Sequence, residues 1–172
     1  PTHTRSSAAS DVYKRQMLTR RSDQTLDFDY AKVTEQSRDN PVFYVQYAHA
    51  RACSVLRQPG INGEDVTGAG DAALDRLTAP AEMAVIKALA SWPRLVVSAA
   101  QSHEPHRVAF YLMDLAASFH ALWTAGREAS ELRFIRDDDA GLTAARLCLV
   151  KATALVISSG LGVLSIQARE EM

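Results

Sequence analysis

Apolar residues recur at helical spacing through the second half of the chain. Between residues 105 and 126 they repeat every three or four positions, and the same spacing returns over residues 143–159. This period places apolar side chains along one face of a helix, so two long helices with buried faces are predicted. Gly126 is predicted to end the first, and Gly160 with Gly162 the second. The predicted core positions are Val108, Leu112, Leu115, Phe119 and Leu122, followed by Leu147, Val150, Ala154, Ile157 and Leu161.

The first half of the predicted fold carries clear start and stop signals. Residues 41–58 are predicted to form a helix, because Asn40 suits the capping position and Pro41 the first turn. Residues 59–79 are rich in glycine and aspartate and are predicted to form a loop, with a short turn near residues 72–77.

A second helix is predicted over residues 80–91, with Glu82 in its first turn. Pro93 is predicted to break it and to leave a short third helix over residues 94–101. No β alternation is visible. Residues 39–172 are therefore predicted to form an all-α, antiparallel bundle of five or so helices whose last residues pack back on it.

The N-terminal part reads differently from the rest. Residues 1–16 are small and polar with no apolar period, and are interpreted as a disordered leader foreign to the fold. Residues 17–38 are mixed and polar, and are interpreted as a segment leading into the bundle.

Composition narrows the class of protein. The chain has 172 residues, of which 47% are hydrophobic and 23% charged, so one domain with a buried core is expected. No long uninterrupted apolar run is present, and no membrane partner is predicted. The net charge of −1 argues against a basic coat and a DNA partner, although it permits a local basic face. Cys53 and Cys148 form no CxxC pattern, which predicts neither zinc nor a disulfide and suits a reducing cytosol.

No catalytic arrangement is found in the sequence. It contains no Gly-rich phosphate loop and no Gly-x-Ser-x-Gly elbow. The segment His103-Glu104-Pro105-His106 contains two possible metal ligands, but Pro105 interrupts the helical geometry that would place them on one face. A turn at a helix start is predicted there, with no metal site.

Several polar and aromatic groups are candidates for binding. Gln46, His49, Cys53 and Arg57 form one polar line on the first helix. Phe119 lies on a core stripe, whereas His120 and Trp123 are freer to face outward, where aromatic rings can stack on unpaired bases. Arginines can contact phosphates, although a solvated or ion-paired arginine is the commoner case. The arginine candidates are Arg51, Arg107, Arg127, Arg133, Arg136 and Arg146.

Specific strings of residues carry a family resemblance. They are DNPVFYVQYAHAR at residues 39–51, EPHR at 104–107, FHALW at 119–123, AARLCLV at 144–150, and a tail that ends in Met172. Together they resemble the C-terminal, DALR-type anticodon-binding domain of arginyl-tRNA synthetases. Residues 17–30 resemble the end of the catalytic domain of that family. In the tail, Ser165 stands where the family often has Gly, and Arg169 where it often has Pro.

The resemblance implies a function. The family joins arginine to its tRNA with ATP, in the cytoplasm, and the intact enzyme needs ATP and magnesium. The HIGH and KMSKS signatures are absent here, so this chain alone is expected to be inactive, with no catalytic residue and no cofactor. Its expected partners are the anticodon stem-loop of arginine tRNA and the catalytic domain of the same enzyme. The implied tRNA-binding residues are Tyr44, Gln46, His49, Arg51, Phe119, His120, Trp123, Arg146 and Met172, with Arg146 also a candidate for packing and orientation.

Two other interpretations are open at this point. A helical protein-interaction module without an RNA ligand would pack the polar line and the aromatics of residues 119–123 inside and would have no basic groove. The anticodon-binding domain of a related class I synthetase, such as the cysteinyl enzyme, would share the bundle. The string YVQYAHAR and the terminal Met172 favour the arginyl family.

Overall fold

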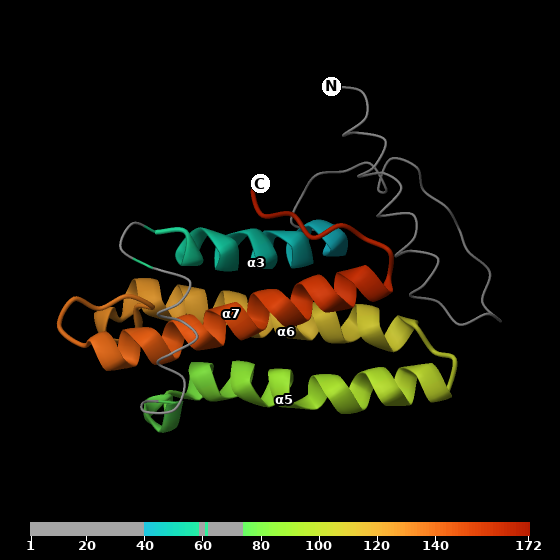
Figure 1. Cartoon of the computed structure of the whole chain (residues 1–172), viewed down its shortest axis with the longest axis horizontal. Helices are drawn as coiled ribbons and strands as arrows, with labels where there is room; N and C mark the ends of the chain where they lie inside the picture. Colours follow the sequence, from blue (N-terminus) through green and yellow to red (C-terminus); the bar gives the residue numbers. More distant parts are fainter. Residues whose placement is uncertain (1–39, 59–60, 62–73) are drawn as a thin grey trace.

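The computed structural model describes residues 40–58, 61 and 74–172. The predicted leader at residues 1–16 and the predicted linking segment at residues 17–38 lie outside this part. The described residues contain α-helices and 3-10 turns and no strand, so the predicted all-α bundle is confirmed (Figure 1). The elements are α3 (Pro41–Leu56), η1 (Leu74–Arg76), α5 (Pro80–Gln101), α6 (His106–Glu128), η2 (Ser130–Leu132) and α7 (Ala140–Val163).

Consecutive helices reverse direction, and α7 runs across the bundle between α3 and α5 with α6 behind it (Figure 1). The two predicted apolar stripes face this centre. Every one of their ten residues is buried, and Phe119, Leu115, Val150 and Ile157 are completely so. The stripes of α6 and α7 therefore form the core, as the 3.6-residue period predicts.

Side chains at the helix starts confirm the local signals. The Asn40 side chain accepts a hydrogen bond from the backbone N–H of Val42 at 3.2 Å. The carboxylate of Asp139 accepts one from Leu142 at 3.0 Å. This cap begins α7 at Ala140, slightly before the start that its apolar period predicts.

The prediction that Pro93 breaks the second helix is wrong, because α5 continues through it. Packing on α6 compensates for the disturbed turn. The Tyr111 hydroxyl donates to the carbonyl of Ala88 at 2.9 Å, and the rings of Tyr111 and Trp92 stack with centroids 5.2 Å apart. Burial raises the pKa of Tyr111 to about 12, so this hydroxyl remains a donor at neutral pH. A proline costs a helix one backbone bond, which tertiary contacts here outweigh.

The glycines predicted to end α6 and α7 have another role. The helix α6 continues past Gly126 to Glu128, and α7 continues through Gly160 and Gly162 to Val163. A Cβ on Gly126 would lie 2.8 Å from the carbonyl oxygen of Leu132, and one on Gly160 would lie 2.7 Å from a methyl of Leu112. These two glycines allow close packing and do not stop the helices.

The end of α7 directs the tail back onto the bundle. Ser165 has a φ of 55°, its N–H donates to Gly162 O at 2.9 Å, and the N–H of Ile166 donates to Leu161 O at 2.9 Å. This pair of bonds is a Schellman motif, which reverses the chain at a helix C-terminus. Leu164 and Ile166 are then buried, so the predicted packing of the tail is confirmed.

The same motif ends α5 and gives a stability prediction. His103 is exposed, has a φ of 55°, and precedes the N–H of Glu104 that donates to Ala99 O at 2.9 Å. Because glycine adopts positive φ without steric cost, His103→Gly is expected to raise the free energy of unfolding by about 0.5–1 kcal/mol. Lys87→Gly, at an exposed position inside α5, is expected to lower it by about 1 kcal/mol. Urea unfolding of both variants tests this prediction. It would be contradicted if the free energy of unfolding rose in both variants or fell in both.

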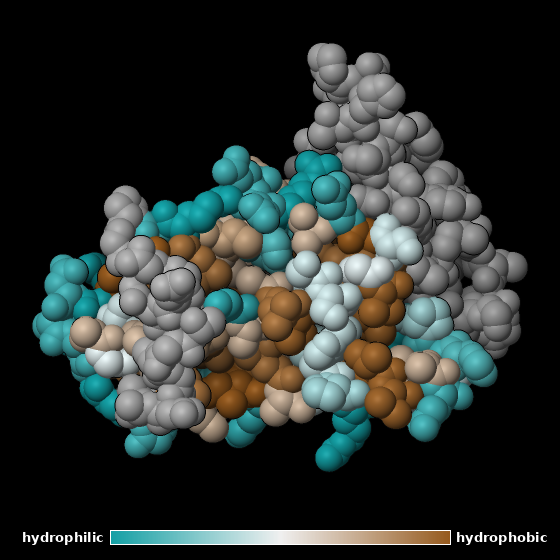
Figure 2. Space-filling view, in the orientation of Figure 1, coloured by the Kyte–Doolittle hydropathy of each residue, from teal (hydrophilic) through white to brown (hydrophobic). Residues whose placement is uncertain are grey.

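Helices α5, α6 and α7 are, by length and composition alone, long and apolar enough to cross a membrane. In α6 and α7, 44% and 50% of the residues in the most apolar stretch of the helix are buried inside the bundle. Figure 2 shows apolar atoms gathered over α7 and α5 on the face turned to the viewer. Leu155 of α7 and Val97 of α5 are among the exposed side chains. The absence of a membrane partner stays a prediction.

Candidate functional site

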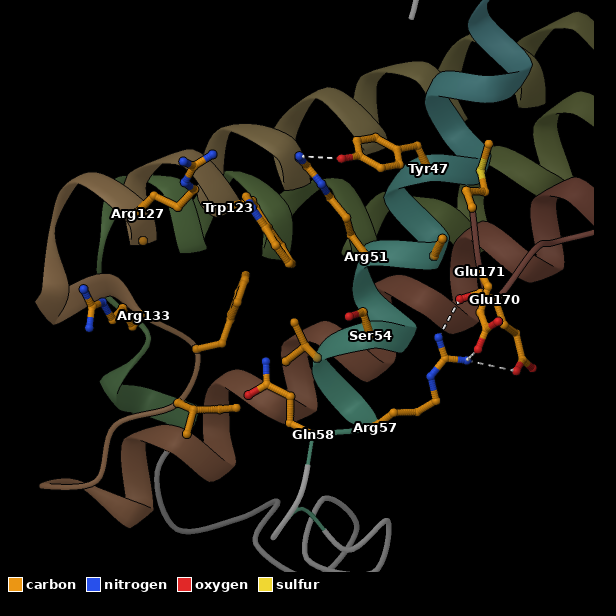
Figure 3. A pocket seen from close by; sticks show the side chains of 16 residues that line it. Tyr47, Arg51, Ser54, Arg57, Gln58, Trp123, Arg127, Arg133, Glu170 and Glu171 are labelled. Carbon is orange, nitrogen blue, oxygen red and sulfur yellow. Dashed lines mark hydrogen bonds and ion pairs between the residues drawn. The ribbon is translucent and has the colours of Figure 1, made fainter. Parts of the chain in front are cut away.

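A groove of about 850 Å³ lies between the C-terminal halves of α3 and α6, the turn after η2 and the end of the tail (Figure 3). Its lining combines aromatic rings with arginines. The aromatic residues are Tyr47, Trp123 and Phe134, and the arginines are Arg51, Arg57, Arg127 and Arg133.

Arg51 lines this groove between two aromatic rings. Its guanidinium lies 4.2 Å from the ring centroid of Tyr47 and 4.9 Å from that of Trp123, and it donates to the Tyr47 hydroxyl at 2.9 Å (Figure 3). Cation–π contacts on two rings hold the guanidinium in place while leaving its charge in the groove. The spacing of Tyr47 and Arg51 on α3, one helical turn, makes the contact possible.

His120 connects Arg51 to the first turn of α3. The guanidinium of Arg51 lies 3.1 Å from Nδ1 of His120, and Nε2 of His120 lies 3.3 Å from the carbonyl oxygen of Tyr44. A guanidinium can only donate, so Nδ1 accepts and the ring proton sits on Nε2, from which it is donated to Tyr44. The rings of Tyr44 and His120 also pack, with centroids 4.6 Å apart. A neutral imidazole therefore orients Arg51.

The aromatic wall of the groove rests on the core. Phe119 is completely buried, and its ring stacks on Phe134 with centroids 6.0 Å apart. The ring centroid of Phe134 in turn lies 5.9 Å from that of Trp123. Phe119 thus supports the groove-lining rings from beneath, as its place on the core stripe predicts.

The arginines of the groove differ in their partners. Arg57 forms ion pairs with Glu170 at 3.6 Å and Glu171 at 3.4 Å. Arg127 and Arg133, on the opposite side, are exposed, and among the residues that the structure describes neither side chain has an ion pair (Figure 3). One half of the groove is therefore basic, although the whole chain has a net charge of −1.

Arg146 lies outside the groove and holds one of its walls. The side chain is buried, with Nε donating to Glu82 at 2.7 Å and one terminal nitrogen donating to the carbonyls of Glu131 at 2.7 Å and Arg133 at 2.8 Å. The other carboxylate oxygen of Glu82 accepts from the N–H of Ala79 at 3.0 Å. The buried pair thus ties the start of α5 to the turn that carries Arg133.

The polar line on α3 faces the tail. Gln46 and His49 are buried, and their side chains lie 2.9 Å and 2.8 Å from the carbonyl oxygens of Gln167 and Arg169. Cys53 sits beside His49, and burial raises the pKa of its thiol, which favours the protonated form.

The predicted site residues therefore fall into groups. Arg51, Trp123 and Met172 line the groove, while Tyr44 and His120 support Arg51 from behind. The four others are buried: Phe119 in the core, Arg146 in its ion pair, and Gln46 and His49 against the tail. RNA contact by all nine stays a prediction, and the buried polar atoms already have partners within the bundle.

Sequence reasoning left two rings out of the site. Tyr47 and Phe134 both line the groove, but neither is among the residues predicted to bind RNA. The signal for Tyr47 was its position one turn before Arg51. Phe134 had no local signal, because Gly126 and Arg146 position its turn. Among the other arginine candidates, Arg107 pairs with Glu104, and Arg136 pairs with Asp138.

Residues 45–172 match the model of the DALR anticodon binding domain. The chain belongs to this family. The chain is 56% identical over 167 residues to the arginine–tRNA ligase of Rhodospirillum rubrum, a match that covers 94% of this chain and 28% of the relative. The ligase of Ruegeria pomeroyi is 54% identical over 165 residues, with 95% and 28% covered. The resemblance to the arginyl family is thus confirmed.

The solved structure of Thermus thermophilus arginyl-tRNA synthetase superimposes on this DALR domain with a TM-score of 0.73 and 30% identity, covering 96% of this chain and 27% of the other. A Campylobacter jejuni structure with 23% identity and a TM-score of 0.78 shows the same fold. The chain spans a little over a quarter of the length of the curated relatives it matches.

Proposed function

We propose that this DALR domain binds the anticodon stem and loop of arginine tRNA as the C-terminal part of an arginine–tRNA ligase. The observation that carries the proposal is the groove, in which Arg51 lies between Tyr47 and Trp123 beside the exposed Arg127 and Arg133. The relatives named arginine–tRNA ligase support the choice of tRNA.

The two halves of the groove suit different parts of a single-stranded RNA loop. Unstacked bases are recognised by stacking on aromatic rings and on guanidinium planes, which Trp123, Tyr47 and Arg51 supply. Phosphates are bound by arginines, which Arg127 and Arg133 supply.

A protein-interaction module was expected to pack the polar line of α3 and the aromatics of residues 119–123 inside and to lack a basic groove. The buried Gln46, His49 and Phe119 match the first expectation. The basic groove, which Trp123 also lines, does not match the second and favours the RNA interpretation.

A tRNA titration at fixed moderate salt tests the proposal. The chain is titrated with arginine tRNA and with a copy whose middle anticodon base is changed. Tighter binding of the unaltered tRNA supports an anticodon reader. Equal weak binding would reduce the groove to a charge-driven RNA surface. No binding by a folded sample would contradict the proposal and favour the protein-interaction interpretation.

The basic half of the groove gives a salt-dependence prediction. Each phosphate contact releases counterions, so Arg127→Ala and Arg133→Ala are each expected to make the plot of log affinity against log salt shallower by about 0.7–0.9. Arg107→Ala is the matched control, because Arg107 is paired with Glu104 and does not line the groove. A slope change for Arg107→Ala as large as that for Arg133→Ala would contradict the assignment.

The whole ligase would join arginine to tRNA with ATP and magnesium, using a catalytic domain that packs with this one. The described residues offer no arrangement for activating arginine. We therefore expect this chain alone to give no ATP–pyrophosphate exchange with arginine. Exchange above background would contradict this part of the proposal.

A further inference from the structure

The polar line of α3 forms a latch for the C-terminal tail. Gln46 Nε2 donates to the carbonyl of Gln167 at 2.9 Å, and His49 Nδ1 lies 2.8 Å from the carbonyl of Arg169. Arg57 continues the line and donates to the carbonyl of Glu170 at 2.9 Å. Because a carbonyl oxygen only accepts, His49 must carry its ring proton on Nδ1.

The bonds from Gln46 and His49 hold the backbone of the tail and do not depend on its side chains, whereas Arg57 also forms ion pairs with the carboxylates of Glu170 and Glu171. All three acceptors are backbone carbonyls, and the side chains of Gln167 and Glu170 are exposed. Gln46 and His49 are 2% and 6% exposed, so both donors are withdrawn from solvent. Buried donors that lose their acceptors carry a free-energy cost, which makes the bound path of the tail strongly preferred.

The tail residues that follow the latch contacts reach the groove. The Schellman turn at Ser165 and the buried Ile166 fix the start of the tail, and the α3 contacts fix its middle. The last residue, Met172, is 54% exposed and lines the groove that Arg51 and Trp123 also line. An exposed terminal residue is usually poorly ordered unless the segment before it is held.

We propose that Gln46 and His49 are positioning residues that hold Met172 at the groove, so that the tail contributes to the choice of anticodon. This inference rests on the proposed function. It assigns to two buried side chains an effect on RNA discrimination that acts through the tail, without RNA contact of their own. Overall RNA attraction, which depends on the exposed arginines, is expected to be almost independent of the latch.

The test uses the full chain and three changes at the latch. His49→Leu removes the donor, His49→Asn keeps an N–H donor close to the place of Nδ1, and Gln46→Met removes the other donor at similar volume. Each is titrated with arginine tRNA and with the copy altered at the middle anticodon base. Removal of Met172 alone serves as the reference for loss of the tail end.

The expected result is a five- to tenfold drop, as an order of magnitude, in the preference for the unaltered tRNA in His49→Leu and Gln46→Met. Removal of Met172 is expected to give the same drop, and His49→Asn to restore most of the preference. Affinity for the altered tRNA is expected to change less than about twofold. An unchanged preference in folded His49→Leu, or in Gln46→Met if His49→Leu does not fold, would overturn the proposal.

A second readout separates this proposal from the proposed function. The methyl signal of Met172 is followed by NMR, with Met83 of α5 and Met113 of α6 as internal references. A sharpened Met172 signal in His49→Leu, with both references unchanged, supports the latch. An unchanged Met172 signal overturns it. If the unmodified chain binds both tRNAs equally, the proposed function fails, and the methyl signal still decides whether the latch positions Met172.

Discussion

Replacing Arg146 with alanine is expected to lower the free energy of unfolding by about 3–5 kcal/mol. The Glu82 side chain, only 2% exposed, would keep its charge in the interior without its partner. The carbonyls of Glu131 and Arg133 would also lose their donor. Removing one member of a buried ion pair is costly because the other remains desolvated and uncompensated, whereas the net value of the intact pair is much smaller.

Urea unfolding followed by circular dichroism measures this loss. Arg107→Ala is the control, because its pair with Glu104 lies at the surface, where solvent screens the charges, and is expected to contribute little to stability. Arg146→Lys keeps the charge, but one ammonium nitrogen cannot reproduce the separate bonds of Nε and the terminal nitrogen, so a smaller loss is expected. A loss for Arg146→Ala no greater than that for Arg107→Ala would contradict the structural role of the pair.

A double variant shows how the charge contributes. In the double variant Glu82→Gln/Arg146→Ala, no uncompensated carboxylate remains. The double variant is therefore expected to lose less free energy of unfolding than the sum of the losses in the two single variants. The side-chain amide introduced at position 82 can still accept from the N–H of Ala79, which preserves the start of α5.

Local signals predicted most of the fold. The cap at Asn40 and the apolar stripes of α6 and α7 depend on neighbours within a few residues, and these predictions are confirmed. The predictions that Pro93 breaks one helix and that Gly126 ends another are wrong, because neither effect is decided by the neighbouring residues alone. What each does depends on a contact with another element of the fold: Tyr111 of α6 packs near Pro93, and Leu132 of η2 lies against Gly126.

The site was predicted in part, and the same distinction explains which part. Trp123 and His120 lie off the core stripe of their helix, and that placement alone indicated that they could face outward. The position of Phe134 depends on the close approach of its turn to Gly126 and on the bonds from Arg146. The polar line of α3 was visible as a line, but its acceptors lie some 120 residues away in the tail, so its purpose could not be read locally.

Trp123→Ala is expected to weaken binding of arginine tRNA by about five- to a hundredfold. Stacking of one base on an aromatic ring contributes about 1–3 kcal/mol. The change also removes one of the two rings that hold Arg51, whose guanidinium lies 4.9 Å from the Trp123 ring. The fold is expected to survive, because Trp123 lies at the groove while the stripe residue Leu122 beside it stays buried.

Two companions make this measurement specific. Trp123→Phe keeps an aromatic face and is expected to retain most of the affinity. Phe110→Ala removes a ring that is 52% exposed on the same helix but does not line the groove, so binding is expected to be unchanged. Equal losses for Trp123→Ala and Phe110→Ala would place the RNA elsewhere.

The salt dependence distinguishes stacking from charge in the same series. Trp123→Ala removes no charge, so its affinity is expected to fall by a similar factor at every salt concentration, with the slope preserved. Arg133→Ala is expected to change the slope itself. If Trp123→Ala instead flattened the slope as Arg133→Ala does, the ring would act mainly by holding the charge of Arg51 in the groove, and direct stacking on a base would be contradicted. The two variants thus separate a groove that stacks bases from one that only attracts phosphates.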